Sequence, residues 1–77
     1  MEHLSLAVLS TDSAKIFAEL TKYASDCECN IEFSWFNRIG DLHITHLHVS
    51  GNWNEIAKFE THLEHVHDHY NASVAFV

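Results

Sequence analysis

The amino-acid sequence predicts an α+β fold in which a four-stranded antiparallel sheet carries two helices on one face. Two runs of alternating apolar and polar residues, 31–37 and 42–49, meet at a short Ile39-Gly40 break and indicate a β-hairpin. Segments with helical spacing of apolar residues flank this hairpin, and a further alternating run lies near each end of the chain. The expected order is therefore strand, helix, hairpin, helix, strand.

The first strand and the first helix are separated by a change of period near residue 10. Leu4, Leu6 and Val8 alternate with polar or small residues, as in a strand with one buried face. The side-chain oxygens of Ser10-Thr11-Asp12-Ser13 can accept hydrogen bonds from free amides at a helix start. Apolar residues then recur at helical spacing, namely Ile16, Phe17, Leu20, Tyr23 and Ala24. We expect the first helix over residues 12–25.

The two hairpin strands present two unlike faces. Alternation places on one side Ile31, Phe33, Trp35, Leu42, Ile44, His46 and His48, and on the other Glu32, Ser34, Phe36, His43, Thr45, Leu47 and Val49. Because right-handed crossovers put both helices on one face of the sheet, we expect the helices to cover the second side. The exposed aromatic and imidazole side chains of the first side are then a candidate interface, formed by Phe33, Trp35, Ile44, His46 and His48.

The second helix begins with the spacing of a capping box, Asn52 followed by Glu55. Apolar residues follow at helical spacing, namely Trp53, Ile56, Phe59, Leu63 and Val66. Ala72, Val74 and Phe76 alternate in a closing strand. The whole order is that of a ferredoxin-like βαββαβ sandwich.

Length and composition place the chain among small globular proteins. Its 77 residues, of which 47% are hydrophobic, are enough for one core, so we expect a single domain over residues 1–77. A formal charge of −7 repels phosphate backbones and anionic membranes, which argues against direct nucleic-acid or membrane binding. Two cysteines, no secretory leader and no transmembrane stretch favour the cytoplasm.

Three short segments resemble a known family. They are Ser10-Thr11-Asp12, Cys27-Glu28-Cys29-Asn30-Ile31-Glu32 and Ser50-Gly51-Asn52-Trp53-Asn54-Glu55-Ile56. Together with the Gly40 turn they resemble an ACT domain, in particular the N-terminal ACT domain of glycine cleavage system transcriptional repressors. The resemblance covers nearly the whole chain.

The resemblance implies a regulatory module that forms a homodimer or pairs with a second ACT domain and binds a small amino acid at the interface. It carries over Asp12, in the loop before the first helix, and Asn30 and Ile31, before the second strand, as ligand-binding residues. Free amides at the helix start suit a carboxylate, and the Asn30 amide can both donate and accept hydrogen bonds. The sequence departs from the family at Lys15, where family members commonly carry glycine.

Plainer roles compete with each candidate site. Asp12 has the position of a helix cap, Asn30 can satisfy loop backbone groups, and Cys27 and Cys29 are typical of small buried residues. His62, His65 and His69 are spaced three and four residues apart and could hold zinc, nickel or copper if the helix reaches residue 69. A solvated helix face is the plainer interpretation of these histidines.

No catalytic constellation is present in the sequence. No nucleophile stands beside a base in a known motif, and Gly40 and Gly51 are the only glycines, so no phosphate-binding glycine loop exists. We therefore expect a regulatory domain that needs no cofactor and is not an enzyme. The alternatives are a histidine-rich metal-binding module and a ligand-free protein-interaction scaffold.

Overall fold

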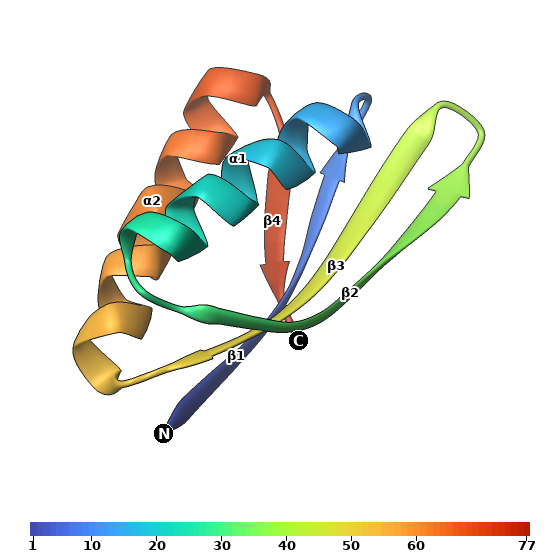
Figure 1. Ribbon diagram of the computed structural model, residues 1–77. Coiled ribbons are helices and arrows are strands. Elements are labelled where there is room, and N and C mark those ends of the chain that lie inside the picture. The colour runs from blue at the N-terminus through green and yellow to red at the C-terminus, as the bar shows by residue number, and fades with distance from the viewer.

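The structure, a computed structural model that describes residues 1–77, has the βαββαβ order that the sequence predicts (Figure 1). Its elements are β1 (Glu2–Ser10), α1 (Ser13–Asp26), β2 (Asn30–Ile39), β3 (Leu42–Gly51), α2 (Trp53–Tyr70) and β4 (Ser73–Phe76). The four strands form one antiparallel sheet in the order β2-β3-β1-β4. The ferredoxin-like fold is thus confirmed.

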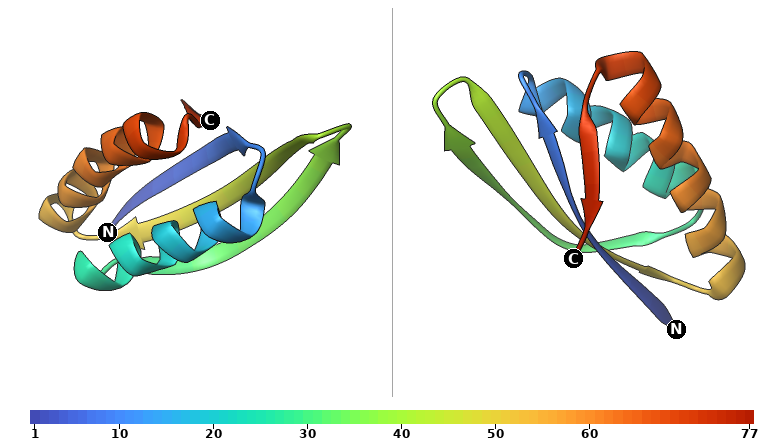
Figure 2. Two further views of the ribbon diagram at one scale, coloured as in Figure 1. Left: turned by 90° about the horizontal axis from the view of Figure 1, so that it is seen from above. Right: turned by 180° about the vertical axis from the view of Figure 1, so that it is seen from behind.

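Both helices pack on one face of the sheet and leave the other uncovered (Figure 2). On the covered face, Leu6 and Val8 of β1 lie beside Leu47 and Val49 of β3, and all four are buried. The helices contribute the rest of the core, mainly Ile16, Leu20, Tyr23, Ile56, Phe59, Leu63 and Val66. The apolar stripes predicted from the sequence therefore face each other across one core, except for Trp53, which is 72% exposed at the start of α2.

The helix ends form as their residue types predict. The Asp12 side chain accepts a hydrogen bond from the Lys15 amide at 3.1 Å, so α1 begins at Ser13, one residue later than predicted. At the start of α2, Asn52 and Glu55 form the predicted capping box, with reciprocal bonds of 2.8 and 2.9 Å. None of the helices combines the length and apolar character needed to cross a membrane.

A β-bulge in β2 corrects one prediction. Ile31 pairs with Val49, and Phe33 pairs with His48, so the extra residue Glu32 lies between two partners that are adjacent on β3. Because a bulge breaks the two-residue alternation, Ile31 lies on the covered face while Phe33 and Trp35 lie on the uncovered one. Placing Ile31 on the same side as Phe33 and Trp35 was therefore wrong. The partly buried Ile31 side chain instead packs against the core.

The far end of the β2–β3 hairpin extends beyond the helices (Figure 1). Gly40 turns the chain there with a φ of 60°, a left-handed conformation that costs glycine little. Phe36 keeps contact with the helical layer through an edge-to-face contact with Phe17 of α1, with ring centroids 5.3 Å apart. The hairpin tip carries exposed Ile39 and Leu42.

Candidate functional site

The uncovered sheet face carries a tile of stacked rings. Because Phe33 pairs with His48 and Trp35 with His46, each phenyl or indole ring lies next to an imidazole of the neighbouring strand. The centroids of Trp35 and His46 are 4.5 Å apart and those of Phe33 and His48 5.2 Å apart, both with planes 14° from parallel. Phe33 also stacks on Trp35 at 5.3 Å. We call Phe33, Trp35, His46 and His48 the aromatic tile.

The two apolar rings of the aromatic tile are open to solvent. Phe33 is 50% exposed and Trp35 46% exposed, while Ile44, His46 and His48 are half-buried beside them. Asn37 contacts His46 through Nδ2 and Nε2, at 3.3 Å. A shallow hollow of about 310 Å³ on this face is lined by Ser5, Leu6, Phe33, Trp35, His46, Leu47, His48 and Val77. Such an apolar patch on a small protein is typical of an interaction surface.

A second hollow, of about 390 Å³, lies where β1 ends and α1 begins. Asp12, the N-cap of α1, and Lys15 in its first turn line the hollow, and Tyr70 lines it from the end of α2. The Lys15 ammonium lies 5.6 Å from the centre of the Tyr70 ring. Ser10 also lines this hollow, and its buried hydroxyl has no hydrogen-bond partner. A positively charged and a negatively charged side chain therefore line one depression, and a buried hydroxyl without a partner belongs to its wall.

Asn30 and Ile31 lie at the opposite end of the sheet from Asp12. Asn30 and His3 both pair with Ser50, and His3 precedes Ser10 by seven positions on β1. At about 3.3 Å per strand residue, this separates the two ends by about 23 Å. A single chain therefore does not bring Asp12 together with Asn30 and Ile31.

The three helix histidines share α2, which continues to Tyr70. His62 stacks on Tyr23 with ring centroids 4.8 Å apart, and His65 and His69 stack on each other at 4.0 Å. The helix therefore reaches residue 69, but no three His, Cys, Asp or Glu side chains in the chain are placed to hold a metal ion.

Both cysteines are buried in the core cluster. Burial raises the pKa of Cys27 and of Cys29, aided at Cys27 by Asp26 and at Cys29 by Cys27. Raised pKa values keep both thiols protonated at neutral pH, and a protonated thiol is a poor nucleophile and a poor metal ligand.

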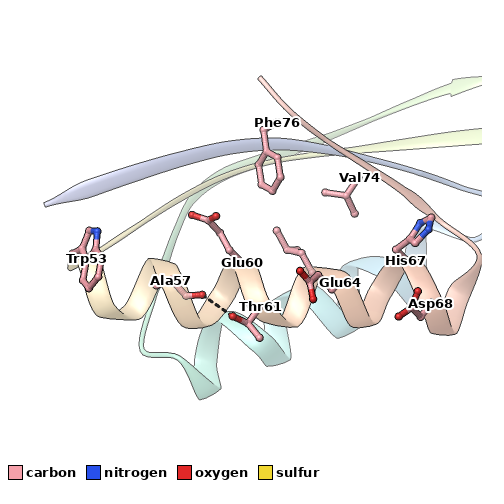
Figure 3. A pocket seen from close by; sticks show the side chains of 10 residues that line it. Trp53, Ala57, Glu60, Thr61, Glu64, His67, Asp68, Val74 and Phe76 are labelled. Carbon is pink, nitrogen blue, oxygen red and sulfur yellow. Dashed lines mark hydrogen bonds between the residues drawn. The ribbon is translucent and has the colours of Figure 1, made fainter.

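Two features were missed at the sequence level. A hollow of about 780 Å³ lies between α2 and β4, where Phe76 and Val74 point toward a helix face bearing Glu60, Glu64 and Asp68 (Figure 3). His3 Nδ1 lies 3.2 Å from His48 Nε2 at one edge of the aromatic tile. The alternation of β1 places His3 and Ser5 on the uncovered face, and this pattern could have indicated the second feature.

No family model matches the chain, and no curated protein matches it in sequence. Solved structures do match. A crystal structure described as that of a glycine cleavage system transcriptional repressor superposes with a TM-score of 0.86 at 23% identity, covering 97% of this chain and 44% of that one. The chain thus spans less than half of that relative's length.

Two further structures share the same architecture. An ACT domain protein from Streptococcus pneumoniae has a TM-score of 0.79 at 13% identity, covering 97% of this chain and 86% of that one. A formyltetrahydrofolate deformylase from Burkholderia mallei has a TM-score of 0.80 at 8% identity, covering 97% of this chain and 27% of that one. At these identities the likeness defines the fold rather than the ligand or partner. The chain has the ACT-domain fold, as its sequence segments indicate.

Proposed function

We propose that this chain is a regulatory, non-catalytic domain of the cytoplasm that pairs with a second copy, or with a second ACT domain, through the aromatic tile. The observation that carries the proposal is the exposure of Phe33 and Trp35 on a sheet face that no helix covers. Burying such rings against another chain removes apolar surface from water, and aromatic residues are enriched at protein interfaces. The output of the domain is then a change in association rather than a reaction.

The ligand of the proposed pair is a small amino acid held near Asp12. The hollow at the start of α1 offers the Lys15 ammonium to a carboxylate and the Asp12 carboxylate to an ammonium group. The positive end of the α1 dipole adds to the attraction for the carboxylate. Lys15, which departs from the family pattern, thus supplies a charge suited to the same ligand.

Asn30 and Ile31 complete this site only from a second copy, because they lie at the other end of their own sheet. The hollow at Asp12 is lined by residues of both helices, on the side of the sheet opposite the aromatic tile. The ligand contact between copies is therefore separate from pairing through the aromatic tile, and a twofold axis through it gives two equivalent ligand sites.

Glycine is the first ligand to test. The structural relative with the highest TM-score given above is described as a repressor of the glycine cleavage system, and this chain matches 44% of its length. From this likeness we infer that the chain belongs to a transcriptional regulator whose activity responds to an amino acid. Two domains of this fold in one regulator would pair as two copies do.

Calorimetric titration with glycine and the other common amino acids tests ligand binding. We expect measurable heat and a raised melting temperature for at least one of them, because a ligand that binds only the folded protein stabilises it. The Asn30→Ala variant should lose the response. Asn54→Ala, an exposed asparagine on α2, serves as the matched control and should keep it. If no amino acid gives heat or a melting shift, ligand binding is excluded and the domain acts through association alone.

A further inference from the structure

Two histidines from different strands meet on the uncovered face. His3 of β1 pairs with Ser50, and His48 of β3 pairs with Ser5, so the two side chains are diagonal neighbours across the strand pair. Their ring centroids are 5.3 Å apart, and His3 Nδ1 lies 3.2 Å from His48 Nε2. His3 is exposed, so solvent and dissolved ions have access to this pair.

The spacing of the two nitrogens fits a tetrahedral metal ion. Zinc binds imidazole nitrogens at about 2.0–2.1 Å, so two nitrogens on the edge of its tetrahedron lie about 3.3 Å apart. The observed 3.2 Å therefore needs little change in separation. One nitrogen of the pair carries the proton of their hydrogen bond, so metal binding requires that proton to be lost and the exposed His3 ring to turn until both lone pairs point at one ion.

The Ser5 hydroxyl is placed to stabilise the form of His48 that a metal ligand requires. Its Nδ1 lies 2.8 Å from the Ser5 hydroxyl, and the Phe33 ring stacks on its face. When Nδ1–H donates to Ser5, Nε2 carries the free lone pair that faces His3. Metal-binding histidines commonly donate their second ring N–H to an oxygen, which fixes both the tautomer and the ring plane. Ser5 can serve as that acceptor.

A carboxylate lies one strand further along. Glu32, the extra residue of the β2 bulge, accepts a hydrogen bond from the Ser50 hydroxyl, and Ser50 pairs with His3. Bulges redirect single side chains and are frequent beside functional sites. The three donors do not converge in the structure, so metal binding requires the Glu32 carboxylate to leave the Ser50 hydroxyl for the ion. Two imidazoles and one carboxylate are a donor set that zinc accepts.

We propose that His3, His48 and Glu32 form a zinc-binding site on the edge of the uncovered sheet face, with water in the fourth position. The site is distinct from the helix histidines His62, His65 and His69 and does not depend on amino-acid binding. A divalent cation also offsets part of the charge of −7 that each copy carries.

Zinc titration of chelator-treated protein, followed by calorimetry and thermal melting, tests this site. We expect one zinc ion per chain and a rise in melting temperature. Changing His48→Gln or His3→Gln should weaken binding by roughly tenfold or more, since ligand-supporting residues alone are worth ten- to hundredfold. Glu32→Gln should also weaken it. The double variant His65→Gln/His69→Gln removes a stacked histidine pair elsewhere and should bind zinc as the unaltered chain does.

Unchanged zinc affinity in His3→Gln and His48→Gln would overturn the proposal, as would a loss confined to the helix double variant. Because His3 is exposed, His3→Gln provides a test that does not depend on how the half-buried His48 site tolerates change. Circular dichroism of each metal-free variant confirms its folding. A negative zinc result beside a positive amino-acid response removes this site and leaves the proposed regulatory function in place.

Discussion

Tyr23 illustrates at the residue scale how the core controls ionisation. Its ring is buried between α1 and α2 and stacks on His62. Burial, followed by the neighbouring Glu19 carboxylate, raises the pKa of the Tyr23 phenol to about 12, because both disfavour a phenolate. Because the pKa of Tyr23 is higher in the folded protein than in the unfolded chain, the free energy of unfolding depends on pH in the alkaline range.

Tyr23 should make the protein less stable above pH 10. An unfolded tyrosine loses its proton near pH 10, while the folded one keeps it to about 12, so the folded state binds more protons between these values. The contribution is complete below pH 10 and is lost as pH rises toward 12. Urea unfolding at pH 8 to 11 measures this contribution. The free energy of unfolding of Tyr23→Phe should fall less steeply with rising pH than that of the unaltered chain. Equal slopes for both proteins would contradict the assigned pKa.

Asn52 should contribute to stability through the capping box alone. Replacing it with alanine removes the acceptor for the Glu55 amide and should lower the free energy of unfolding by about 1 kcal/mol. Asn54→Ala, two residues later and exposed, removes no capping bond and should change stability by less than about 0.5 kcal/mol. Urea titration of the three proteins compares them. Equal effects at both positions would contradict the role of the cap.

At the scale of elements, the β2–β3 hairpin depends on its turn. Gly40 has a φ of 60°, and beyond its two chain neighbours no residue has an atom within 4 Å of where a Cβ would be. Gly40→Ala should therefore cost about 1 kcal/mol through backbone conformation rather than through a clash. Gly40→Asn should cost less, because asparagine tolerates the left-handed region better. Urea unfolding of both variants separates the two causes. If a steric clash set the cost, the larger asparagine would destabilise the protein more than alanine.

The elements could be predicted from sequence because each of their signals is local. Alternation gave the strands, and the Asn52–Glu55 spacing gave the start of α2 to the residue. The bulge at Glu32 could not be predicted in this way, because no glycine or proline marks it and it depends on how β2 pairs with β3. Ile31 was therefore assigned to the wrong face, whereas Phe33 and Trp35, beyond the bulge, keep the alternation of β3.

The candidate sites depend on distances that a sequence does not contain. The alternation of β3 placed His46 and His48 on the uncovered face, as observed. The wide separation of Asp12 from Asn30 and the approach of His3 to His48 follow only from strand register. Histidine spacing in α2 drew attention to His62, His65 and His69, but two of these rings stack on each other and the third stacks on Tyr23.

At the scale of the whole molecule, charge and apolar surface act in opposite directions. Each copy carries a formal charge of −7, which opposes association, while the aromatic tile favours it. Because salt screens repulsion between exposed charges, with a Debye length of about 10 Å at 0.1 M, we expect tighter self-association at higher ionic strength. Sedimentation at several salt concentrations measures this, and weaker association in salt would indicate an interface held by ion pairs instead.

Sedimentation equilibrium of the unaltered chain, Trp35→Ala and Trp53→Ala tests the central claim most directly. Both tryptophans are exposed, but Trp35 belongs to the aromatic tile and Trp53 lies at the start of α2. If the uncovered face is the pairing surface, the unaltered chain and Trp53→Ala form dimers and Trp35→Ala is shifted toward monomer. An unaltered chain that remains monomeric at high concentration, or a Trp53→Ala variant that dissociates as readily as Trp35→Ala, would contradict the account.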